Sequence, residues 1–375
     1  MRLLWRVLGI GWLIFVDASA AEEPAWHQVV RQGADLRRAG RFRESEAVYL
    51  RAREEFRTLG EESLAAATIE GQLGGLYMGT GRFAEAEPLL RHSLTVFEKL
   101  RGEKDVTVGV ALNNLADCQR VRANYAEADM LFGRAFVIYE KVYGARHMEV
   151  ASVLYNWSLL CYVAKRTSRA EVLLRRAMEI QEVLVGPEAP ESMRVLATQA
   201  LLALDAGRPE EAEHLQRRVL EWRERTQGGG GPGLLPSLNN LALTYLYMKR
   251  YTEAEPLLRR ALETGEGTDS FDISPILHNL GELCSRQERY AEAEPLLRRA
   301  MELTERALGP SHPEVAEILL SYADVLSHLR HKGKAKRMRA RAAQIVSAHR
   351  RGNGLDHRVD VRDLVPGRSG RGYGR

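Results

Sequence analysis

The side chains with the clearest catalytic potential are glutamate pairs, Glu253 with Glu255 and Glu292 with Glu294. Neighbouring carboxylates can serve as a general acid and a general base. Both pairs stand in almost the same string, which reads YTEAEPLLRRA at 251–261 and YAEAEPLLRRA at 290–300. A pair that recurs with a repeated string is more typical of a helix beginning, where negative charge favours the helix dipole. We therefore interpret these glutamates as first-turn residues of helices, with no catalytic role.

The other residues of reactive type form no catalytic or metal-binding signature. His147 with Glu149 and His312 with Glu314 lack the spacing of a zinc-binding HExxH helix. The glycine run QGGGGPG at 227–233 lacks the Lys-Ser/Thr of a phosphate loop and is interpreted as a flexible connector. The three cysteines are too widely spaced for a CxxC site and are expected to be small buried side chains: Cys118, Cys161 and Cys284. The sequence predicts neither an enzyme nor a cofactor or metal site.

The repeated string belongs to a unit that recurs eight times. In each copy, such as GRFAEAE at 81–87, we call the third residue the anchor. The anchors are separated by 41, 42, 42, 42, 42, 39 and 42 residues, and they are Phe42, Phe83, Tyr125, Thr167, Pro209, Tyr251, Tyr290 and Lys332. So steady a period predicts a solenoid, in which each unit packs on its neighbours.

Each unit is predicted to be a pair of amphipathic helices, the second of which begins at the anchor. Small residues recur at three places of the unit, and only Val219 among them is larger than Ala or Ser. Examples are Gly281, nine residues before its anchor, and Ala293, three residues after it. Side chains this small allow paired helices to approach closely, so these positions specify a fold and not a reaction.

This spacing of small and aromatic residues resembles the tetratricopeptide repeat. The 42-residue period and the loop LGPSHPEVAEIL at 308–319 resemble the kinesin-light-chain type of that family. The resemblance covers residues 24–346 and implies an all-α, right-handed superhelical α-solenoid of about eight helix-turn-helix units. It also implies a non-enzymatic scaffold that binds a protein or peptide partner along the concave groove. The repeats are irregular near 209–233, where Pro209 is the anchor and Gln199 and Gln216 replace apolar residues, so a bend is expected near 227–233.

The candidate binding site is a row of amides on the first helices, which line the concave side in such arrays. Amide side chains offer both a donor and an acceptor, so a row of them can satisfy an extended peptide backbone. The candidate groove residues are Asn113, Asn114, Tyr155, Asn156, Leu159, Tyr162, Leu201, Asn239, Asn240, Leu243, Tyr247, His278 and Asn279. The alternative, equally open at this point, is that the asparagines bond a neighbouring helix.

The first twenty residues have the layout of a secretory signal peptide. Arg2 and Arg6 precede a ten-residue apolar run, Val7 to Val16, and an Ala-Ser-Ala cleavage site follows at 18–20. The run is too short to cross a bilayer, which takes about 20 residues. We expect residues 1–20 to be removed and the protein to be periplasmic or secreted, in a bacterium. The alternative is a membrane anchor formed by an uncleaved N-terminus.

The C-terminal end is strongly basic. Residues 330–351 contain nine Lys or Arg and no Asp or Glu, while the first 329 residues carry a net charge of −7. The last unit is expected to be a polar cap, with residues 347–375 as a disordered basic tail. An alternative function is an adaptor that docks on an anionic membrane or nucleic acid through this end. Export argues against nucleic acid as the partner.

Overall fold

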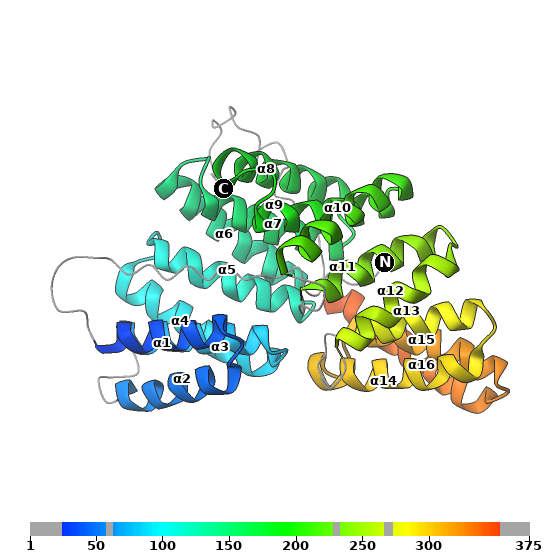
Figure 1. Ribbon diagram of the computed structural model, residues 1–375. Coiled ribbons are helices and arrows are strands. Elements are labelled where there is room, and N and C mark those ends of the chain that lie inside the picture. Colours follow the sequence, from blue (N-terminus) through cyan, green and yellow to red (C-terminus); the bar gives the residue numbers. More distant parts are fainter. Residues whose placement is uncertain (1–24, 58–62, 228–232, 266–272, 353–375) are drawn as a thin grey trace. The chain divides into compact units, whose positions relative to one another are not determined.

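The computed structural model describes residues 25–57, 63–227, 233–265 and 273–352 (Figure 1). Within these ranges the chain forms sixteen α-helices and no β-strand, which confirms the predicted all-α fold. The chain divides into two compact units between Ala145 and Arg146. We call the described parts, 25–145 and 146–352, the N-terminal and C-terminal units.

The N-terminal and C-terminal units each consist of several repeats, and each repeat is a helical hairpin with a first and a second helix. The N-terminal unit contains α1 (Ala25–Arg38), α2 (Phe42–Arg57), α3 (Leu64–Gly79), α4 (Phe83–Arg101), α5 (Val106–Val121) and α6 (Tyr125–Tyr143). The C-terminal unit contains α7 (Met148–Val163), α8 (Thr167–Val185), α9 (Pro190–Asp205), α10 (Pro209–Gln227), α11 (Leu234–Tyr247), α12 (Tyr251–Thr264), α13 (Ser274–Arg286), α14 (Tyr290–Leu308), α15 (Pro313–His328) and α16 (Lys332–Gly352). Within the N-terminal or C-terminal unit, a first helix packs on the second helix of its own hairpin and on the second helix of the preceding hairpin. This is the packing of a solenoid.

All eight second helices begin at the predicted anchors. The turn that leads into each of them is also the same. The residue two before the anchor has φ between +59° and +77°, as in Gly81 and Glu288. The next backbone N–H donates to the carbonyl five residues back, over 2.7–2.9 Å. This pattern ends a helix with a left-handed residue and lets the chain reverse direction in a short turn.

The small residues of the repeat lie where paired helices approach most closely. A Cβ on Gly74 would come within 2.8 Å of Leu90, and one on Gly281 within 2.8 Å of Leu297. Ala116 and Ala242, at the corresponding place of other hairpins, are fully buried. The predicted role of these positions in close packing is therefore confirmed.

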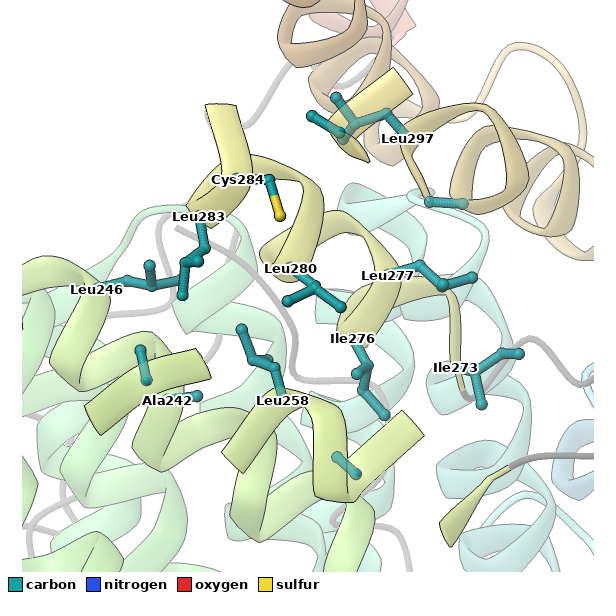
Figure 2. Packing of buried hydrophobic residues seen from close by; sticks show 14 of the residues in the cluster. Ala242, Leu246, Leu258, Ile273, Ile276, Leu277, Leu280, Leu283, Cys284 and Leu297 are labelled. Atoms are coloured by element: carbon teal, nitrogen blue, oxygen red, sulfur yellow. The ribbon is translucent and has the colours of Figure 1, made fainter. Parts of the chain in front are cut away.

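A continuous apolar core connects the later hairpins of the C-terminal unit. Figure 2 shows Ile276, Leu280 and Cys284 of α13 in one cluster with Leu258 of α12 and Leu297 of α14. Tyr251 and Tyr290, the anchors of two hairpins, pack on the same cluster while half-buried. Burial of such surface stabilises the fold by about 25 cal/mol per Å² of apolar area.

The three cysteines are buried and free, as the sequence predicts. Burial raises the pKa of the Cys118 thiol to about 12, which keeps it protonated and unreactive at neutral pH.

The histidines of the long loops cap helices. The Nδ1 atom of His312 accepts a hydrogen bond from the backbone N–H of Glu314 at 3.3 Å, at the start of α15. His147 makes the same bond to Glu149 at the start of α7. An N-cap acceptor satisfies a donor that has no partner within the helix. These bonds explain both histidine–glutamate pairs without a metal ion.

The irregular stretch 209–233 is accommodated inside the C-terminal unit. Pro209 occupies the first position of α10, where proline is tolerated. Gln216 is fully buried, and its Nε2 donates to the carbonyl of Ala197 at 3.2 Å. The expected bend falls partly on residues 228–232, which lie outside the described residues. The boundary between the two units falls earlier in the chain, at 145–146.

Both ends of the chain carry predictions that the described residues do not cover. The predicted signal peptide, residues 1–20, lies outside them, as does 353–375 of the expected tail. Residues 347–352 of that expected tail belong to α16. No helix among the described residues combines the length and hydrophobicity needed to cross a membrane.

Candidate functional site

The first helices contact one another in chain order within each unit. In the C-terminal unit the contacts run from α7 to α9, α11, α13 and α15. We call the surface formed by these five helices the first-helix face. Eleven of the thirteen candidate groove residues lie on its helices, and the other two, Asn113 and Asn114, lie on α5 of the N-terminal unit.

Several candidate asparagines are buried between first helices. Asn239 and Asn279 are 3% and 0% exposed, and the Nδ2 of Asn279 donates to the Oδ1 of Asn239 at 2.9 Å. This bond joins α13 to α11. Asn240 and Asn114 are also buried. For Asn239 and Asn279 the arrangement is the one that the sequence left open as the alternative, a bond between neighbouring helices.

Two further side-chain bonds join neighbouring first helices. The imidazole Nε2 of His278 lies 3.1 Å from the hydroxyl of Ser321, which links α13 to α15. The hydroxyl of Thr198 donates to the Tyr155 hydroxyl at 3.4 Å, which links α9 to α7. Polar groups that satisfy one another in this way fix the spacing of buried helices.

The accessible part of the candidate site is smaller than the sequence suggested. Leu159, Tyr162 and Leu201 are buried, whereas Asn113, Asn156 and Leu243 are half-buried. Tyr247, near the end of α11, is 56% exposed. In the C-terminal unit, a partner on the first-helix face could therefore reach Asn156, Leu243 and Tyr247 without any rearrangement.

A charged cluster lies beside Tyr162. Lys165 Nζ is 3.3 Å from a carboxylate oxygen of Asp205 and 5.1 Å from the centre of the Tyr162 ring. Burial, reinforced by the negative charge of Asp205, raises the pKa of the Tyr162 hydroxyl. The hydroxyl therefore stays protonated and acts as a hydrogen-bonding group, not as a base.

The glutamate pairs of the second helices are engaged in ion pairs between repeats. Arg250 donates to Glu253 of its own hairpin at 2.8 Å and to Glu213 of the preceding hairpin at 2.7 Å. Arg82 does the same with Glu85 and Glu46, both at 2.6 Å. We call this recurring set the arginine–glutamate ladder. Its carboxylates pair with arginines of their own and neighbouring hairpins, which agrees with a structural role for these glutamates.

The ladder shifts the carboxylate titrations in one direction. A hydrogen bond from Arg82 lowers the pKa of Glu85. Burial alone would raise the pKa of Glu255, but hydrogen bonds from Arg259 and Arg289 outweigh it and the net pKa is lowered. Partners that stabilise the charged form produce this effect.

The ladder is interrupted in the N-terminal unit, and a cavity opens there. Eight residues after the anchor, five of the eight repeats carry arginine, but the first carries Leu50. Nine residues after it, seven repeats carry arginine and the second carries His92. In the next pair of hairpins these arginines bridge α4 and α6, through Arg91 to Glu127 and Arg134 to Glu98. Where Leu50 and His92 replace them, a cavity of about 670 Å³ lies between α2, α3 and α4.

A buried carboxylate forms part of the wall of this cavity. Thirteen residues before the anchor, six repeats carry a leucine that is at most 2% exposed: Leu112, Leu154, Leu196, Leu238, Leu277 and Leu319. The second repeat carries Glu70 there, 6% exposed. Its two oxygens meet Arg53 Nε at 2.9 Å and His92 Nδ1 at 2.5 Å. Sequence reasoning missed Glu70, although aligning the eight repeats position by position would have singled it out.

The stacked hairpins define the chain as a helical-repeat protein. The tetratricopeptide repeat family matches residues 24–99, 64–124, 107–182, 191–266 and 272–347. These ranges cover most of the chain, so the protein belongs to the tetratricopeptide repeat family. A comparison with curated proteins finds no match.

Solved structures that are similar to this chain include two Rap proteins and a kinesin-light-chain protein. A Rap protein complexed with Competence and Sporulation Factor has a TM-score of 0.60 and 13% identity, covering 87% of this chain and 99% of that one. The apo form of RapI has a TM-score of 0.57 and 14% identity, covering 76% and 98%. A Podosopora anserina structure described as "kinesin light chain nearly identical TPR-like repeats" has a TM-score of 0.43 and 20% identity, covering 54% and 96%. At 13% and 14% identity, the likeness to the two Rap structures shows the fold alone.

Proposed function

We propose that this protein is a non-enzymatic interaction scaffold that holds a peptide or partner segment along the first-helix face of its C-terminal unit. The observation that carries this proposal is the set of side chains that stay accessible there. Tyr247 exposes 56% of its surface, and Leu243 and Asn156 are half-buried on the same face. An exposed aromatic residue, on a face that also carries accessible apolar and amide groups, is a typical anchor for a peptide.

The rigidity of the face also supports the proposal. Bonds such as Asn279 to Asn239 and His278 to Ser321 tie first helices together from within. A surface held in this way loses little conformational entropy when a partner binds. In fold, the chain is similar to a Rap protein complexed with Competence and Sporulation Factor. The buried asparagines then position the face, and the accessible residues contact the partner.

Site-specific photo-crosslinking tests this proposal. A benzoylphenylalanine at position 247 replaces one exposed aromatic side chain by another on the first-helix face. The matched control places it at Met130, which is 54% exposed on a second helix. In an extract of cells that produce the protein, we expect one discrete crosslinked partner from position 247 and none from position 130.

Substitution then tests the contact itself. Tyr247→Ala is expected to weaken capture of the crosslinked partner at least tenfold and to leave the melting temperature within about 1 °C, because the side chain is exposed. Equal crosslinking from positions 247 and 130, or full capture by the Tyr247→Ala protein, would contradict binding on this face.

We also propose a second candidate function, docking on an anionic membrane through α16. Among the described residues, Lys332, Lys334, Lys336 and Arg337 are exposed and form no ion pair, whereas Arg339 and Arg341 are paired with Asp324 and Glu305. Cations at the start of a helix oppose the helix dipole, so an anionic surface would relieve an unfavourable arrangement.

A charge-reversal variant that the fold should tolerate can be chosen by comparison with the other second helices. Lys334→Glu with Lys336→Glu places glutamates where other second helices, such as α12, carry Glu253 and Glu255. Docking predicts that the wild-type chain co-sediments with vesicles containing phosphatidylserine and that the double variant does not. Binding of both proteins to neutral phosphatidylcholine vesicles would count against an electrostatic mechanism.

Export is proposed as well, with cleavage between Ala20 and Ala21. The support is the sequence pattern of residues 1–20. N-terminal sequencing of the protein from its own cells is expected to begin at Ala21. A chain that begins at Met1 and sediments with membranes would instead indicate the uncleaved anchor.

A further inference from the structure

We propose that the cavity between α2, α3 and α4 is a second binding site, which takes a lysine or arginine side chain of a partner peptide. The cavity of about 670 Å³ is lined by Leu50, Leu73 and Leu89 among its apolar residues. Glu70 supplies a buried carboxylate in its wall. The site is on the N-terminal unit, so it does not depend on binding at the first-helix face.

The position of Glu70 is the first argument for a ligand. Glu70 places a carboxylate where six other repeats bury a leucine. Burying a charge lowers the stability of a fold compared with burying an apolar side chain of similar size. The backbone around Glu70 is the same regular helix as in the other repeats. A costly residue at a place where leucine serves six times therefore points to recognition.

The partners of Glu70 are the second argument, because their side chains are far more exposed than its own. The Glu70 side chain is 8% exposed, whereas those of Arg53 and His92 are 46% and 41% exposed. The Glu70 carboxylate is thus buried in the wall, and the more exposed side chains of Arg53 and His92 reach in from the surface to contact its two oxygens. An incoming cation can replace one of them at Glu70 without moving any helix.

Charge selects a cation over an anion. The lining contains three carboxylates, Glu54, Glu70 and Glu85, against the single guanidinium of Arg53 and the imidazole of His92. Arg82 pairs with Glu85, and the three carboxylates still outnumber the two guanidinium groups around them. An acidic ligand would meet this excess, whereas an ammonium or guanidinium group complements it.

The apolar walls select the rest of the ligand. Lysine and arginine carry a methylene stem below the charge, and such stems pack on apolar surface while the head group pairs. Leucine side chains from α2, α3 and α4 border the cavity and offer that surface. Its volume is within the range of ordinary ligand sites.

The test uses the full chain and three small probes: the N-acetyl N-methylamides of lysine, norleucine and glutamate. Saturation-transfer NMR is expected to detect the lysine probe at millimolar concentration and neither of the others. Glu70→Leu should remove the lysine signal. The same variant should raise the melting temperature by about 2 °C or more, because it restores the leucine of the other repeats.

Two further variants separate recognition from general effects. Glu98→Gln removes a carboxylate from α4 outside the cavity and should leave lysine binding unchanged. His92→Ala frees one oxygen of Glu70 and is expected to strengthen lysine binding about threefold. Lysine binding that survives Glu70→Leu, equal binding of norleucine, preference for the glutamate probe, or absence of any lysine signal would each overturn the proposal.

Discussion

Gly281 shows how little room the repeat leaves between paired helices. A Cβ at this position would lie 2.8 Å from the Cγ of Leu297, closer than real Cβ contacts. We expect Gly281→Val to lower the free energy of unfolding by about 1–3 kcal/mol, because Leu297 must leave its packed position. Urea unfolding followed by circular dichroism measures the loss.

The matched control is Gly79, at the end of α3. A Cβ there meets no heavy atom within 4 Å. Gly79→Ala should leave stability unchanged or raise it slightly, since alanine favours the helix. If Gly281→Val unfolds at the same urea concentration as the wild-type chain, α13 and α14 leave enough room at position 281 for a larger side chain.

Substitution of Asn239 and Asn279 tests whether these amides hold neighbouring first helices together or contact a partner. Asn239→Ala leaves the buried Nδ2 of Asn279 without its acceptor, which should cost about 1–3 kcal/mol. Asn156 is half-buried and within reach of water, so Asn156→Ala should cost less stability than Asn239→Ala.

A double-mutant cycle gives the decisive measurement for this pair. Asn239→Ala with Asn279→Ala should cost clearly less than the sum of the two single variants, because neither partner is then left unsatisfied. Strictly additive losses would mean that the two amides do not interact.

The turn between the helices of a hairpin is the element that repeats most strictly. At the position two before the anchor, Gly40, Gly81 and Gly207 adopt positive φ, and so does Glu288 at +64°. A side chain is strained in this region, whereas glycine is not. Glu288→Gly is therefore expected to raise the free energy of unfolding by about 0.5 kcal/mol.

Glu282→Gly serves as the comparison, since it lies inside α13 with ordinary helical geometry. It should destabilise by about 1 kcal/mol. Thermal melts of the two variants thus move in opposite directions. A lower melting temperature for Glu288→Gly would show that its side chain contributes more than its backbone strain costs.

The starts of the second helices were predictable to the residue, because the same pattern recurs eight times in the sequence. Even Thr167 and Pro209, which are poor matches to the aromatic anchors, could be placed by the period alone. Burial of the amides was harder to foresee. It depends on how closely two first helices from different repeats approach, as at Asn239 and Asn279, and one repeat does not contain that information.

The cavity was missed for a related reason. A repeat pattern draws attention to what recurs, whereas Glu70 and His92 are exceptions to it. Each looks ordinary in its own helix, and their meeting depends on the packing of α3 against α4. An exception at a leucine position therefore becomes informative only when the repeats are compared column by column.

On the scale of the whole molecule, the arginine–glutamate ladder couples stability to pH. It joins successive hairpins in both units, for example at Arg82 and at Arg250. Glu85, Glu87, Glu253 and Glu255 all have a pKa lowered from 4.5, with arginine hydrogen bonds as a cause in each case. In the unfolded chain each returns to its ordinary value. Near pH 4.5 the folded state therefore binds fewer protons than the unfolded state.

The sign of the pH effect follows from linkage. A carboxyl group whose folded pKa is lowered contributes stability above its unfolded value, and that contribution is lost as the pH falls through the folded value. We expect the melting temperature to be nearly constant between about pH 7 and pH 5.5 and to fall progressively below about pH 4.5. Scanning calorimetry in steps of half a pH unit measures the curve.

Two controls tie this loss to the ladder. Glu255→Gln should flatten the curve below pH 4.5, since it removes a group held by Arg259 and Arg289, while lowering the melting temperature at pH 7. Salt at 0.5 M should reduce the whole effect, because these pairs are partly exposed and become screened. A melting temperature that is independent of pH down to pH 3.5 would mean that the ladder orders the surface without stabilising the stack.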